Sequence, residues 1–189
     1  MKNLLKISFV LSLLFMFNCT GTIKPLGYFS LYPYSNPAAN QNHTTLNILL
    51  GDDVKNDFSV KSTGIKEMQV RDFRKSVESS LINTFQENYK NIRVCETISG
   101  QGLTLTVYRI RPFWKLEDIF TPSETLKERY VVSAGFQIDA ALFLNGKKIK
   151  SVVDTIYSDE KMTNTHQAHN IFKNGFEKVC ETINHRLFI

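Results

Sequence analysis

Residues 134–157, AGFQIDAALFLNGKKIKSVVDTIY, decide the fold class because they predict a long β-hairpin. Asn145-Gly146 is the preferred pair for a two-residue type I′ turn, in which both central residues need a positive φ. Turn length sets the register, and the predicted partners are Leu142 with Ile149, Ala140 with Ser151, Ile138 with Val153, Phe136 with Thr155 and Ala134 with Tyr157. That face is mainly apolar and the opposite face mostly polar, so we expect a sheet with one buried face.

Two amphipathic helices are predicted beside this hairpin. One begins after Ser62 or Thr63, runs to about Tyr89, and has an apolar stripe at steps of three or four: Val70, Phe73, Val77, Leu81 and Phe85. The other begins near Asn164 or Thr165 and has the stripe Phe172, Phe176, Val179, Ile183 and Leu187.

Further strands are predicted at residues 45–50, 57–61, 92–98 and 102–113. The last of them changes phase after Val107, which suggests a bulge or burial on both sides. Pro112 predicts either the end of pairing or an edge position. The fold class is therefore α+β, with two layers: an antiparallel sheet and two helices packed on one of its faces.

Residues 1–18 have the features of a secretory signal peptide. Lys2 and Lys6 precede an apolar run over residues 7–17. A bilayer-spanning helix needs about 20 apolar residues, so this run is too short to be one. It ends at Asn18-Cys19, without the pair of small residues that marks an ordinary cleavage site.

A cysteine directly after such a run resembles the lipobox of bacterial lipoproteins. The usual pattern has Leu where this chain has Met16, and Gly, Ala or Ser where it has Asn18. The resemblance implies cleavage before Cys19, a diacylglycerol on its sulfur and an acylated amino terminus. Thr20 in place of Asp implies delivery to the outer membrane. The alternatives are an uncleaved anchor and an ordinary signal peptide with an incidental cysteine.

The predicted organisation is a signal peptide at 1–18, a lipidated cysteine and tether at 19–43, and a single α+β domain at 44–189. The tether is unusually apolar, since it holds Tyr28, Phe29, Leu31, Tyr32 and Tyr34. These residues either pack on the domain or lie at a membrane interface, where tyrosine is favoured. Packing is the interpretation we prefer.

Candidate reactive groups are few. Outside the cytoplasm Cys95 and Cys180 could form a disulfide, and the alternative is two buried free thiols. His166 and His169 could share a metal, but no third ligand stands at a readable spacing, so a solvated start of the last helix is preferred. No catalytic motif is visible, and we expect neither an enzyme, a metal nor a cofactor.

Charge argues against nucleic acid as a partner. Without residues 1–18 the chain keeps 21 basic and 18 acidic side chains, and the basic ones form no stripe. A better candidate for contact lies in the segment 113–128, predicted to be an irregular hairpin connection. Its large apolar residues either anchor a partner or fold onto the core, and they are Phe113, Trp114, Leu116, Ile119 and Phe120.

The overall layout resembles small α+β outer-membrane lipoproteins: the lipopolysaccharide-assembly lipoprotein, YajG-type lipoproteins and those accessory to ABC transporters. The resemblance rests on element order, on Leu31-Tyr32-Pro33 before the first strand and on Arg129-Tyr130-Val131-Val132 before the hairpin. It implies a non-catalytic accessory in the cell envelope that contacts the bilayer through acylated Cys19 and binds an envelope protein or lipid at the periplasmic face. The alternatives are an extracytoplasmic metal- or thiol-dependent enzyme and a surface-exposed host-binding lipoprotein.

Overall fold

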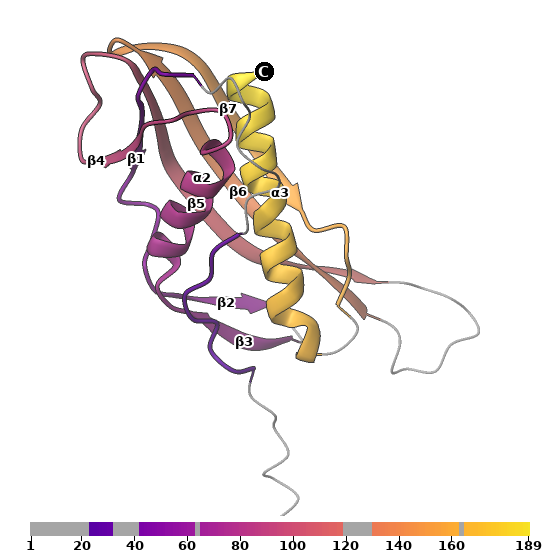
Figure 1. Cartoon of the computed structure of the whole chain (residues 1–189). Helices are drawn as coiled ribbons and strands as arrows, with labels where there is room; N and C mark the ends of the chain where they lie inside the picture. Colours follow the sequence, from indigo (N-terminus) through magenta and orange to yellow (C-terminus); the bar gives the residue numbers. More distant parts are fainter. Residues whose placement is uncertain (1–22, 32–41, 63–64, 119–129, 163–164) are drawn as a thin grey trace, which may run out of the picture.

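The computed structural model describes residues 23–31, 42–62, 65–118, 130–162 and 165–189. A five-stranded sheet in the order β4-β1-β5-β6-β7 carries two helices on one face (Figure 1). Its strands are β1 (Leu46–Leu50), β4 (Ile92–Cys95), β5 (Leu103–Asp118), β6 (Tyr130–Leu144) and β7 (Lys147–Tyr157). The helices are α2 (Phe73–Phe85) and α3 (Ala168–Phe188), and the 3-10 turn η1 (Thr165–Gln167) precedes α3. A separate hairpin consists of β2 (Phe58–Ser62) and β3 (Ile65–Val70).

The α+β class and the two helices on one face are confirmed, but the sheet is mixed and not purely antiparallel. β1 pairs in parallel with both β4 and β5, whereas β5, β6 and β7 are antiparallel to their neighbours. Parallel neighbours need a long crossover connection. Here α2 lies between β1 and β4 in the chain and supplies it, a pairing that strand patterns alone do not encode.

The hairpin turn is confirmed, since Asn145 has φ 51° and Gly146 has φ 77°. The predicted register holds only beside the turn, where Phe143 faces Lys148. A bulge at Ile149 then shifts every later pair by one, so that Leu142 faces Lys150 and not Ile149. The other predicted pairs are wrong for the same reason; the observed ones are Ala140–Val152, Ile138–Asp154, Phe136–Ile156 and Gly135–Tyr157.

The bulge exchanges the two faces of β7, because one inserted residue reverses the alternation of side chains. Val152 becomes buried on the helix side, and Val153 is 79% exposed on the other. The predicted apolar face of β6 is confirmed, since Phe136, Ile138 and Ala140 are all buried.

The helix α2 begins later than predicted. Residues 65–70 form β3 instead, which pairs with β2, and Asp72 in a left-handed conformation (φ 53°) separates strand from helix. Val70 fitted the helical spacing but belongs to the strand. The remaining stripe of α2 is buried as predicted, and so is the whole predicted stripe of α3.

Strand β5 extends five residues beyond its predicted end, to Asp118. Its register shifts between Val107 and Arg109, which confirms the predicted bulge. β1 pairs with β5 only as far as Val107, so Pro112 lies where β5 has no strand on that side within the described part of the chain. This agrees with the edge position predicted for Pro112.

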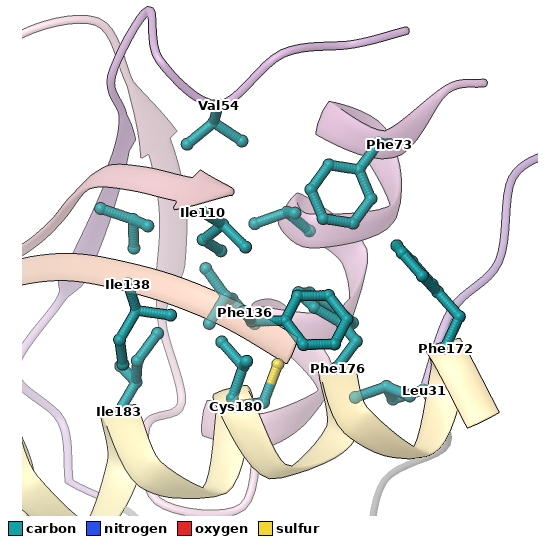
Figure 2. Close-up of a cluster of buried hydrophobic side chains, with 14 of the residues drawn as sticks. Leu31, Val54, Phe73, Ile110, Phe136, Ile138, Phe172, Phe176, Cys180 and Ile183 are labelled. Carbon is teal, nitrogen blue, oxygen red and sulfur yellow. The ribbon is translucent and has the colours of Figure 1, made fainter. Parts of the chain in front are cut away.

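The core lies between the helices and the sheet, with Phe136 of β6 beside Phe172 and Phe176 of α3 (Figure 2). The segment 23–31 belongs to this core: Ile23, Leu26, Phe29 and Leu31 are all buried. Packing on the domain is thereby confirmed for Phe29 and Leu31 of the predicted tether, whereas Tyr28 is 55% exposed and Tyr32 and Tyr34 lie outside the described residues. Within the described ranges, no helix is long and apolar enough to cross a membrane.

Candidate functional site

The predicted contact residues on strand β5 point to opposite faces of the sheet. Trp114 points to the helix side, is buried, and lies 6.4 Å from Phe172 between ring centroids. Its indole N–H has no hydrogen-bond partner among the described residues. Trp114 is therefore a core residue and not a partner anchor. Leu116 is 36% exposed on the same side, and Ile119 and Phe120 lie outside the described residues.

Phe113 points to the sheet face that the helices leave uncovered. We call this the open face, and its side chains are Arg109, Arg111, Phe113, Lys115, Gln137, Asp139, Val153, Thr155 and Tyr157. They alternate along each strand with residues that face the helices. Sequence reasoning identified only Phe113 among them, because the bulges at Tyr108 and Ile149 decide which β5 and β7 side chains point this way.

An aromatic group occupies one end of the open face. Phe113, Gly135 and Tyr157 are neighbours on three adjacent strands. The Phe113 ring covers Gly135, where a Cβ atom would come within 2.4 Å of its Cζ. The Phe113 and Tyr157 rings meet edge to face at 5.9 Å, and the Lys115 ammonium lies 4.8 Å from the Tyr157 ring centroid. Gly135 thus leaves room for a small aromatic-cationic surface.

Two arginines continue the open face toward β1. The Arg109 guanidinium donates to the Asp53 carboxylate at 3.4 Å, and Asp139 is its cross-strand neighbour. Arg111 stands opposite the neutral Gln137 and makes no ion pair with a described residue. Arg111 therefore keeps its donors available for an anionic partner.

Two hollows adjoin these arginines. A cavity of about 440 Å³ lies between β2 and β5, lined by Asp53, Lys55, Phe58, Ser59, Arg109, Ile110, Arg111 and Pro112. Another, of about 490 Å³, is lined by Arg109, Gln137, Asp139, Val153 and Thr155 of the open face, with Ile138 and Asp154. Guanidinium groups match carboxylate and phosphate oxygens in a bidentate geometry. The arrangement can therefore hold an anionic group against apolar side chains.

Of the two alternatives predicted for Cys95 and Cys180, the structure has the free thiols and not the disulfide. Cys95 lies on β4 and donates to the Ile48 carbonyl, at 3.6 Å. Cys180 lies on α3, which packs on β6 and β7, whereas β4 forms the opposite edge of the sheet. Burial raises the pKa of the Cys180 thiol to about 12, and burial also raises that of Cys95. Neither thiol has the low pKa of a nucleophile.

A histidine near the start of α3 makes a structural contact. His169 donates from Nε2 to the Lys24 carbonyl at 2.7 Å, which holds the segment 23–31 against the start of α3. The described residues contain no group of three or more metal-ligating side chains. His169 therefore acts as a clamp between two parts of the chain.

No protein-family model and no curated protein sequence matches this chain. Solved structures that share its fold include the following two. A Xanthomonas campestris protein of family DUF330 is 14% identical with a TM-score of 0.55, covering 87% of this chain and 94% of that one. A Helicobacter pylori homologue of the neuraminyllactose-binding hemagglutinin is 15% identical with a TM-score of 0.54, covering 86% and 92%.

A minor lipoprotein from Acinetobacter baumannii is 10% identical, with a TM-score of 0.48 over 78% of this chain and 92% of that chain. At such identities a likeness shows a common architecture and no common activity. The first two structures therefore establish that this arrangement of sheet and helices occurs in bacterial proteins of widely different sequence.

Proposed function

We propose that this protein is a non-catalytic lipoprotein of the bacterial cell envelope that acts as a binding or assembly accessory through its open face. The observation that carries the proposal is the character of that face. It presents Arg111, Phe113 and Tyr157 on paired strands, with no helix over them among the described residues. Exposed aromatic and arginine side chains are the residue types that dominate binding energy at protein interfaces.

The proposed anchor is the acylated Cys19. One acyl chain holds a protein to a membrane only marginally, and stable anchoring needs a second signal. A triacylated cysteine supplies more than that, so the domain would remain at one leaflet. The proposed location is the outer membrane, at its periplasmic face.

The proposed partner is an envelope protein or lipid that brings an anionic group to Arg111. Its apolar part would contact Phe113 and Tyr157. The Arg109–Asp53 pair is half exposed on both sides, at 51% and 59%, so solvent screens it and it can exchange partners at little cost.

Affinity capture from crosslinked membranes tests this function. The wild-type chain is expected to recover an outer-membrane or transporter component, and Arg111→Glu to recover at least tenfold less of it. Lys75→Glu is the matched control, because this substitution also replaces a cation by an anion, on the exposed side of α2. Equal recovery by both variants would exclude the open face as the binding site.

Radioactive palmitate tests the anchor separately. The wild-type chain should incorporate label and the Cys19→Ala variant should not. A native polypeptide whose amino terminus carries no fatty acid would remove the anchor from the proposal, whatever the capture experiment finds.

A second candidate is an outward-facing, host-binding lipoprotein. The fold shared with the hemagglutinin homologue favours this candidate over an extracytoplasmic enzyme. Protease treatment of intact cells distinguishes the outward-facing protein from the periplasmic accessory. Rapid cleavage of the domain indicates the outer surface, and protection until the outer membrane is broken indicates the periplasmic face.

A further inference from the structure

We propose that the outer edge of β7 pairs with the same edge of a second copy of this chain. The two strands would run antiparallel about a twofold axis, with Val152 opposite Val152 of the copy. The two sheets would then form one continuous sheet. This inference is independent of the lipid anchor and of the open-face partner.

The edge is available because β7 is the last strand of the sheet. It pairs with β6 on one side and with no described strand on the other. Residues 151–157, SVVDTIY, are rich in β-branched side chains and contain a single charge, Asp154. An edge of this composition lacks the closely spaced lysines that usually prevent strand addition. The lysines of β7 are confined to the first four residues of the strand.

Charge complementarity identifies the occupant. Lys150 faces Leu142 and Asp154 faces Ile138, so both charged side chains lie on the helix side of β7. Neither makes an ion pair with a described residue; Asp154 Oδ1 only accepts from the Thr155 amide, at 2.7 Å. Four residues along a strand separate them by about 13 Å, too far for an ion pair within one chain. With Val152 at the axis, Lys150 of each copy lies opposite Asp154 of the other.

The same two charges disfavour the neighbouring registers. An axis at Lys150 or at Asp154 would place like charges directly opposite, which is destabilising. An axis at Ser151 or Val153 would leave both Lys150 and Asp154 without a charged partner on their own face. Only the register about Val152 forms two ion pairs.

The packing around this axis is also compatible with a dimer. Val153, exposed to 79% in the single chain, would lie opposite Ser151 of the copy and gain cross-strand contacts. Helix α3 packs on β6 and β7. With paired strands about 4.8 Å apart, the two α3 axes would lie about 10 Å apart, a normal distance between packed helices.

A cysteine placed on the axis tests the register. Val152→Cys in a Cys95→Ser background, expressed as the full chain in its membranes, should give a covalent dimer on mild oxidation. Gln137→Cys in the same background is the control, because Gln137 is exposed on β6, away from the edge. No dimer from Val152→Cys, or as much from Gln137→Cys, would overturn the proposal.

Charge exchange tests the occupant. Lys150→Asp and Asp154→Lys should each weaken dimerisation of the detergent-purified full chain about tenfold, since two attractive pairs become repulsive. The double variant should restore it, and Lys75→Asp, on the exposed side of α2, should leave it unchanged. A wild-type chain that sediments as a monomer at every concentration, or a double variant as weak as the singles, would contradict the proposal.

Discussion

At the scale of single residues, Gly175 sets how closely α3 approaches the sheet. A Cβ atom at this position would lie 2.8 Å from Cε2 of Phe136 and 3.3 Å from the Cβ atoms of Ala134 and Ser158. Phe136 is fully buried. Close packing of α3 on the sheet therefore requires a glycine at position 175.

Gly175→Ala is expected to destabilise the fold by about 1–3 kcal/mol, because overpacking outweighs the roughly 1 kcal/mol gain in helix propensity. Denaturant unfolding measures the difference. Asn170→Ala is the control on an exposed position of the same helix and should be neutral or slightly stabilising. A more stable Gly175→Ala variant would show that α3 does not pack this closely.

The thiols give a second prediction at this scale. With Cys19→Ala as background, Cys180 should react with a thiol reagent only after unfolding, and Cys95, partly exposed, should react slowly in the native protein. Cys180→Ser and Cys95→Ser identify each signal. Rapid labelling of Cys180 under native conditions would contradict its burial.

The raised pKa of Cys180 also predicts a pH dependence. The folded chain keeps this proton up to about pH 12, whereas the unfolded chain releases it near the usual pKa of 9.0. The contribution of Cys180 to stability is thus complete below pH 9 and falls as the pH rises above it. Unfolding of wild type and Cys180→Ala across this range should show a steeper loss for wild type.

At the scale of elements, the β6–β7 hairpin depends on its turn. Asn145 and Gly146 both have positive φ. Asn145 also ties the turn to the start of β5: its Oδ1 accepts from the Gly102 amide at 2.8 Å, and its own amide donates to the Gly102 carbonyl at 2.9 Å. The turn therefore aligns three strands.

Gly146→Ala should destabilise the protein by about 1–2 kcal/mol, since a Cβ atom is strained at this φ. Gly100→Ala is the matched control, because nothing lies within 4 Å of a Cβ atom there and its φ is ordinary. Thermal unfolding compares the two. Equal midpoints would mean that the turn does not require the left-handed conformation.

The hairpin also shows how far sequence prediction reaches. Asn145-Gly146 predicted the turn correctly, because its conformation depends on two local residues. The bulge at Ile149 has no such local signature, and it reversed the predicted faces of β7. The parallel pairing of β1 and the formation of strand β3 also have no local signature, because both depend on partners distant in the sequence. Of the predicted contact residues, Phe113 lies on the open face and Trp114 in the core, a difference that alternation alone could not assign.

At the scale of the whole molecule, the segment 23–31 closes the core. The Phe29 ring lies within 6.5 Å of the ring centroids of Phe73, Phe172 and Phe176, so it contacts both helices. The Ser76 and Ser80 hydroxyls of α2 accept from the amides of Phe29 and Leu31. The segment is therefore part of the domain.

Phe29→Ala should destabilise the protein by about 3–5 kcal/mol, the usual effect of removing a buried aromatic ring. Tyr28→Ala is the control, because Tyr28 is 55% exposed. This substitution should lower the free energy of unfolding far less, although it removes the hydrogen bond from the Tyr28 hydroxyl to Ser79. Chemical denaturation provides both values. A similar loss of stability in both variants would show that the segment 23–31 is not inserted into the core.

If the chain is cleaved and lipidated at Cys19 as proposed, only residues 20–22 separate that cysteine from the buried Ile23. Ile23 is four residues after Cys19, and four residues span at most about 14 Å. A lipid on Cys19 would accordingly keep the Lys24–His169 contact, and with it the beginning of α3, within that height of the headgroups. The domain would then be held close to the headgroups, and a partner would have to come to the membrane surface to meet it.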